Sequence, residues 1–133
     1  MDILFASDLH VSRNHLKRLL SLGEEKRVDA IVIGGDLVPR EGYHETIEEM
    51  VEYQRRYLKE TFVPLIEQFK KRNPGVSLFL DMGNDDFAAN RDVLEERDGD
   101  LFHLLHMKVH PLTDEVDVAG YMCVPPTPFS LKD

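Results

Sequence analysis

Residues 29–36 read Asp-Ala-Ile-Val-Ile-Gly-Gly-Asp, a short apolar run that stops at two glycines and a carboxylate. An uninterrupted apolar run of this length predicts a strand in a parallel sheet that is covered on both faces. Two other runs have the same form: residues 2–7 precede Asp8-Leu9-His10, and residues 76–82 precede Gly83-Asn84-Asp85-Asp86. Three buried strands, each followed by polar residues, therefore decide the fold class.

The segments between these strands have helical spacing. Leu16, Leu19 and Leu20 predict a helix over residues 14–22, which Gly23 is expected to end. Residues 43–71 also have a helical period, and Pro64 is expected to kink or split that helix. Residues 87–97 predict a third helix.

The last third of the chain predicts two short strands, at residues 107–112 and 116–122, and an extended proline-rich loop at residues 124–129. The alternation of strands and helices implies an α/β fold with a mainly parallel sheet flanked by helices. We expect a single domain over residues 1–133, since the sequence shows no internal repeat or linker.

Composition excludes several classes of protein. The 133 residues carry a formal net charge of −9, which argues against non-specific binding to a nucleic-acid backbone. No apolar run approaches the roughly 20 residues that span a bilayer, so we expect no membrane partner. The start of the chain lacks the features of a signal peptide. The single Cys123 cannot form an internal disulfide, and the cytoplasm is the expected compartment.

Polar residues that follow different strands should meet at one edge of the sheet, where ligands of open α/β folds bind. Carboxylate, imidazole and amide groups suit Mn²⁺, Fe²⁺ or Zn²⁺. Alternation along an extended segment would put Asp8 and His10 on the same side, and Asp36 could bridge two ions. Taken singly, each motif has an ordinary explanation, such as a turn or a helix cap formed by Asp85 or Asp86. Their joint occurrence in this order favours a metal site.

These motifs resemble those of the calcineurin-like metallophosphoesterase superfamily, in particular its small prokaryotic members. Asp8-Leu9-His10 matches the family's Asp-x-His block, and Gly35-Asp36-Leu37-Val38 matches its Gly-Asp block. Gly83-Asn84-Asp85-Asp86 matches Gly-Asn-His-Asp/Glu at all but one position, and residues 120–129 resemble a stretch that follows it. The resemblance covers nearly the whole chain and implies the N-terminal half of a metallophosphoesterase α/β sandwich.

The resemblance implies two divalent metal ions, with Mn²⁺ preferred and Fe or Zn as alternatives. Asp8, His10 and Asp36 would hold the first ion, Asp36 would bridge, and Asn84 would help to hold the second. The implied reaction is hydrolysis of a phosphomonoester or phosphodiester by a hydroxide held between the ions. The substrate would be a small phosphate ester or a nucleotide.

Asp85 stands where the family usually has a catalytic histidine, and we assign it as the candidate catalytic residue. Near two cations its carboxyl would be ionised and would donate a proton poorly. We therefore expect aryl phosphate esters, which have good leaving groups, to react faster than alkyl esters; equal rates would contradict this.

The chain ends at Asp133, before the isolated His and the Gly-His-x-His block of the family, so we expect it to be truncated at its C-terminus. Weak metal binding would follow, and an uncovered sheet face would favour a homodimer. The resemblance assigns the stretch with His103, His106 and His110 to a strand away from the metals, whereas His44 could line the pocket mouth. The alternative function is a catalytically incompetent phosphoesterase-like module that binds a ligand or a protein. A receiver-like α/β domain fits the motifs poorly.

Overall fold

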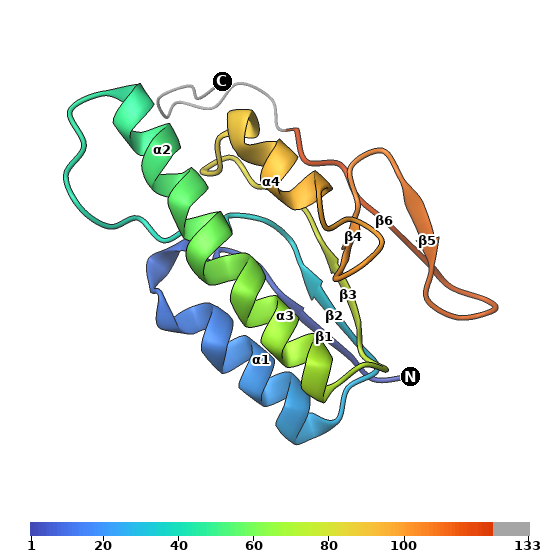
Figure 1. Ribbon diagram of the computed structural model, residues 1–133. Helices are drawn as coiled ribbons and strands as arrows, with labels where there is room; N and C mark the ends of the chain where they lie inside the picture. Colours follow the sequence, from blue (N-terminus) through green and yellow to red (C-terminus); the bar gives the residue numbers. More distant parts are fainter. Residues whose placement is uncertain (124–133) are drawn as a thin grey trace.

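A computed structural model describes residues 1–123, which form a four-stranded parallel sheet in the order β1-β2-β3-β4 (Figure 1). The strands are β1 (Ile3–Ala6), β2 (Ala30–Ile33), β3 (Ser77–Leu80) and β4 (His103–Leu104). An antiparallel hairpin, β5 (Val109–Pro111) and β6 (Asp117–Ala119), forms a second small sheet. The predicted parallel α/β architecture is confirmed.

Helices cover one face of the parallel sheet, as Figure 1 shows. They are α1 (Asn14–Lys26), α2 (Ile47–Tyr57), α3 (Val63–Arg72) and α4 (Arg91–Glu95), with a π-helical turn, η2 (Leu58–Phe62), between α2 and α3. Two 3₁₀ turns, η1 (Leu9–Val11) and η3 (Ala88–Asn90), precede α1 and α4. The main core lies between these helices and alternate strand residues, among them the fully buried Ile31, Ile33, Leu78 and Leu80.

The opposite face of the sheet is covered unevenly. Leu112 and Val118, from the region of the β5-β6 hairpin, pack against a smaller cluster of Ala30, Val32, Phe79 and Leu105. The β1 residues of this face, Ile3 and Phe5, are 45% and 65% exposed. The expectation of a doubly covered sheet therefore holds for β2, whose four residues are all buried, and is wrong for β1 because the hairpin does not cover it.

Two expectations about helices have different outcomes. Gly23 does not end α1, which continues to Lys26 and is capped by Arg27 at a φ of 54°. A Cβ at Gly23 would lie 2.7 Å from Cδ1 of Ile31, so the glycine permits close packing on β2. At Pro64 the helix is not split: its hydrogen bonding changes in the π-helical turn, the proline lies in the first turn of α3 directly after it, and the helical backbone continues from Ile47 to Arg72 without a gap.

The remaining elements are shorter than predicted. The helix expected at residues 87–97 is a 3₁₀ turn followed by α4, and each hairpin strand has three residues. The apolar pattern does not predict β4 (His103–Leu104). The family resemblance does assign a strand to this stretch, and β4 agrees with it. The extended loop expected at residues 124–129 lies outside the described residues. In the described part of the chain, no helix has the length and apolar character that crossing a bilayer requires.

Candidate metal centre

The loops after β1, β2 and β3 are tied to one another by hydrogen bonds. The N–H of Asp8, after β1, donates to the carbonyl oxygen of Gly35, after β2, at 3.2 Å. The N–H of Asp85, after β3, donates to Oδ1 of Asp36 at 2.8 Å. The three polar motifs therefore meet at the carboxyl edge of the sheet, as the strand order predicts.

Two glycines allow this approach. Gly35 has a φ of 115°, and a Cβ there would lie 2.8 Å from the Cα of Gly83. A Cβ on Gly83 would overlap the carboxylate and the backbone nitrogen of Asp36. Because no side chain fits between these backbones, both positions require glycine.

Asp86 joins the second and third loops. Its carboxylate accepts hydrogen bonds from the N–H groups of Leu37 (2.9 Å), Val38 (3.1 Å) and Gly83 (2.9 Å). Burial raises the pKa of Asp86 to about 6, although these backbone donors act in the opposite direction. The residues at the N-cap positions of η3 and α4 are Phe87 and Asn90, which both follow this motif.

Asp8, His10 and Asp36 form a compact cluster in which the three ligand atoms all lie within 4.8 Å of one another. Nε2 of His10 is 3.5 Å from Oδ1 of Asp8 and 3.7 Å from Oδ2 of Asp36. The side chains of His10 and Asp36 are 13% and 10% exposed, whereas that of Asp8 is 63% exposed. The cluster is thus open to solvent on the Asp8 side.

The local backbone differs from the extended segment that the sequence suggested. Asp8 has a φ of 56°, and residues Leu9–Val11 form a 3₁₀ turn, so a tight turn rather than strand alternation brings Asp8 and His10 together. Asp36 also has a left-handed backbone, with a φ of 53°. Aspartate tolerates this conformation better than most residues, and such strain is concentrated at functional sites.

The electrostatics of the cluster favour a bound cation. Burial raises the pKa of Asp36, the carboxylates of Asp85 and Asp8 add to this, and the Asp85 N–H and His10 oppose it. A hydrogen bond from the Ser7 hydroxyl, 2.6 Å long, lowers the pKa of Asp8. A divalent ion would relieve the electrostatic repulsion between carboxylates that face one another in this way. The two carboxylate oxygens and one imidazole nitrogen suit Mn²⁺, Fe²⁺ or Zn²⁺. Within residues 1–123, no other group of three His, Cys, Asp or Glu side chains has this geometry.

A pocket of about 250 Å³ opens beside the cluster. Asp8, Asp36 and the exposed Asn84 contribute to one side of it, together with the glycine loops. Met82, Tyr121 and Met122 provide a less polar part of the lining. The pocket thus joins the carboxylates, the amide and a partly apolar wall, the features expected where a polar group and an organic substituent bind together.

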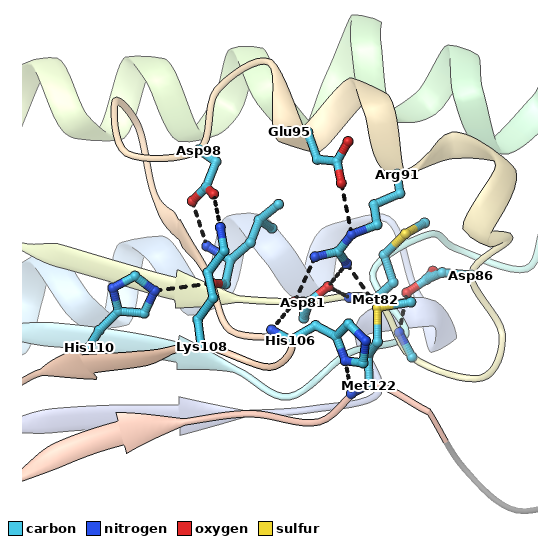
Figure 2. A network of polar contacts seen from close by, with 12 residues as sticks. Asp81, Met82, Asp86, Arg91, Glu95, Asp98, His106, Lys108, His110 and Met122 are labelled. Carbon is cyan, nitrogen blue, oxygen red and sulfur yellow. Dashed lines mark hydrogen bonds and ion pairs between the residues drawn. The ribbon is translucent and has the colours of Figure 1, made fainter.

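A partly buried polar network connects this wall to the end of β3 (Figure 2). Arg91 of α4 forms an ion pair with Asp81, which follows β3, and Oδ2 of Asp81 also accepts a hydrogen bond from the N–H of His106 at 2.6 Å. Nδ1 of His106 in turn accepts a hydrogen bond from the N–H of Met122 at 3.1 Å. The end of β3 is therefore connected to the segment that carries Tyr121 and Met122.

Asp85 lies near the cluster but contacts a different nitrogen of the histidine. Its Oδ2 is 3.0 Å from Nδ1 of His10 and forms an ion pair with Arg40. The Asp85 carbonyl oxygen accepts a hydrogen bond from Nε2 of the buried Gln54, 2.7 Å long. Sequence reasoning missed Arg40 and Gln54; Arg40 stands four residues after Asp36, whereas nothing in the pattern of α2 marked Gln54.

The other histidines lie apart from the cluster. The ring of His44 packs on Tyr53, and its Nε2 lies 3.0 Å from the carbonyl oxygen of Glu41. His103 and His110 pack against Phe79 on the far face of the sheet. His44 does not line the pocket, contrary to what its position after the second motif suggested.

Comparisons with known proteins bear on the fold and the family of the chain. No curated protein matches the chain. One crystal structure superposes with a TM-score of 0.67 at 20% sequence identity, covering 90% of this chain and 52% of that one. The chain therefore spans about half the length of this structural neighbour, which shows the fold alone. A family model described as calcineurin-like phosphoesterase matches residues 1–124, almost the entire chain, and the chain belongs to that family.

Proposed function

We propose that this chain acts in a divalent-metal-dependent phosphoesterase that hydrolyses a phosphomonoester or phosphodiester. The observation that carries the proposal is the convergence of Asp8, His10 and Asp36 beside a pocket, in a chain of this family. Substrates of suitable size are small phosphate esters and nucleotides. The single Cys123 favours a reducing compartment, and we propose the cytoplasm.

The residues divide between two proposed metal positions. Asp8 and His10, with one oxygen of Asp36, are the proposed ligands of the first ion, and Asp36 with Asn84 would serve the second. Bound ions of this kind lower the pKa of water and neutralise charge on the phosphoryl oxygens. Mn²⁺ is our first choice for a site of carboxylates, imidazole and amide, with Fe or Zn as alternatives.

The chain's own groups orient the substrate. The carboxylate side of the pocket is the proposed position of the phosphoryl group once its charge is balanced by cations. Tyr121 and Met122 offer a surface for the organic substituent. The backbones of Gly35 and Gly83, which carry no side chains, leave room next to Asp36.

Cleavage of an aryl phosphodiester with and without Mn²⁺ tests this proposal. We expect Mn²⁺-dependent hydrolysis that Asp36→Ala abolishes. Asp92→Ala is the matched control. Asp92 is an exposed carboxylate of α4 that forms an ion pair with Arg55 of α2. Equal rates for the wild type and Asp36→Ala would contradict the proposal.

The alternative is a module of the same fold that binds a ligand or a protein without turnover. The presence of Asp85 in place of the family histidine favours it, because an ionised carboxylate ion-paired with Arg40 is a poor proton donor. The alternative predicts Mn²⁺ binding without hydrolysis of either aryl or alkyl esters. Titration calorimetry and the hydrolysis assay, carried out on the same preparation, separate the two functions.

A further inference from the structure

We propose that Asp85 is a positioning residue that orients His10 for metal binding, rather than a group that acts on the substrate. The inference rests on the proposed function, since it assumes that His10 is a metal ligand. It assigns to Asp85 a role different from that of the histidine whose place it takes in the third motif.

The two nitrogens of the His10 ring face different partners. Nε2 faces the cluster and lies 3.5 Å from Asp8 and 3.7 Å from Asp36. Nδ1 is buried and lies 3.0 Å from Oδ2 of Asp85, without the alignment of a full hydrogen bond. A carboxylate on the second nitrogen fixes the tautomer and the orientation of a metal-ligating histidine.

Asp85 is held firmly enough to perform this role. Its N–H donates to Oδ1 of Asp36 at 2.8 Å, and its carbonyl oxygen accepts from Gln54 at 2.7 Å. Arg40 contacts the same Oδ2 that faces His10, and the Arg40 N–H donates to the carbonyl oxygen of His10 at 2.9 Å. These two backbone hydrogen bonds do not involve the Asp85 side chain and remain available when it is removed.

The location of the carboxylate argues against direct action on a substrate. The Asp85 side chain is 8% exposed and does not line the pocket, whereas the neighbouring Asn84 does. One oxygen, Oδ2, meets both Arg40 and His10. An asparagine with its Oδ1 in that place could accept from both donors, so the proposed role needs an acceptor oxygen and not a negative charge.

Mn²⁺ affinity, measured by titration calorimetry on the full chain, tests the inference without an activity assay. We expect Asp85→Ala to weaken Mn²⁺ binding by about 10- to 100-fold. Asp85→Asn should stay within about threefold of the wild type, because it retains the acceptor oxygen. His10→Ala should abolish binding, and Asp92→Ala should leave it unchanged. Thermal unfolding without metal checks that each variant is folded.

The outcomes separate the inference from the proposed function. Equal losses in Asp85→Ala and Asp85→Asn would mean that the charge matters and would overturn the positioning role. Wild-type affinity in Asp85→Ala would also overturn it while leaving the metal site intact. If Asp85→Ala fails to fold, Asp85→Asn remains as the test. A more than tenfold loss of Mn²⁺ affinity in folded Asp85→Asn would overturn the inference. A wild type that does not bind Mn²⁺ would overturn both the inference and the proposed function.

Discussion

At the scale of single residues, Gly83 determines whether the second and third loops can meet. A Cβ there would overlap Asp36, and the neighbouring Gly35 backbone leaves no room for a shift. We expect Gly83→Ala to lower the free energy of unfolding by about 2–3 kcal/mol, as overpacking does, and to reduce Mn²⁺ binding. Urea denaturation and calorimetry measure the two effects.

Gly75 provides the control for that substitution. It lies in the turn before β3, and a Cβ there would have no atom within 4 Å. Gly75→Ala should change the free energy of unfolding by less than about 1 kcal/mol and leave Mn²⁺ binding unaffected. Similar effects of the two substitutions would show that the close approach at Gly83 is not important.

The candidate ligands could be identified from the sequence because each follows a strand, and parallel strands end at one edge. Their local geometry could not, since the left-handed backbones of Asp8 and Asp36 depend on the hydrogen bonds of the folded loops. The contacts of Asp86 and Gln54 were also missed. The Asp86–Leu37 and Gln54–Asp85 hydrogen bonds join residues 49 and 31 positions apart, and apolar periodicity contains no information about such pairs.

At the scale of secondary-structure elements, the Asp81–Arg91 ion pair fixes α4 to the end of β3. The two side chains are 9% and 19% exposed, and Asp81 also accepts from the N–H of His106 (Figure 2). We expect Asp81→Ala to lower the free energy of unfolding by about 3 kcal/mol, because it leaves a partly buried arginine without its partner.

Asp92, the residue after Arg91, is the matched control for this prediction. Its ion pair with Arg55 lies on the surface, and the Asp92 side chain is 52% exposed. Asp92→Ala should cost about 1 kcal/mol or less. Urea denaturation compares the two variants; equal losses would argue against a special role for the Asp81 network.

His103, which lies on the hairpin side of the sheet, should make the free energy of unfolding depend on pH. Burial lowers the pKa of His103, and His110, Lys70 and Lys108 act in the same direction, whereas Asp98 opposes them. The fold therefore favours the neutral ring, and the unfolded chain binds more protons. This contribution is fully present above a pH of about 6.5 and is lost as the pH falls from there towards the pKa of the folded state.

His103→Phe keeps a ring against Phe79, 5.4 Å away in the wild type, and removes the proton site. We expect the variant to lose less stability than the wild type between pH 7.5 and pH 5.5. Urea denaturation at the two values of pH measures this difference. An identical loss in both proteins would show that His103 does not contribute to the acid sensitivity.

Elements with long, regular patterns were predictable, and those that depend on tertiary contacts were not. The buried runs at β1, β2 and β3 identified the sheet, and Pro64 marked the π-helical turn before α3. Gly23 was misread as a helix end because its packing on Ile31 is visible only in the folded chain. The two residues of β4 are too few to produce a period and become a strand only by pairing with β3.

At the scale of the whole molecule, the two faces of the sheet differ. Helices cover one face from β1, where Leu4 and Ala6 are partly buried, to β4, whereas the hairpin covers the other face only near β2 and β3. Ile3 and Phe5 lie on β1, which is an edge strand in the described part of the chain. An edge strand with exposed apolar side chains is a site at which copies of a chain associate.

We therefore expect the 133-residue chain to self-associate through this surface. Phe5→Ser should weaken association by about tenfold or more, since burial of one such side chain contributes roughly 1.5–3 kcal/mol. Sedimentation equilibrium over a range of concentrations measures the effect, and circular dichroism checks the fold. Val109→Ser is the control, because Val109 is also 65% exposed but lies on the hairpin. A monomeric wild type, or equal association of the wild type and Phe5→Ser, would exclude this surface as the interface.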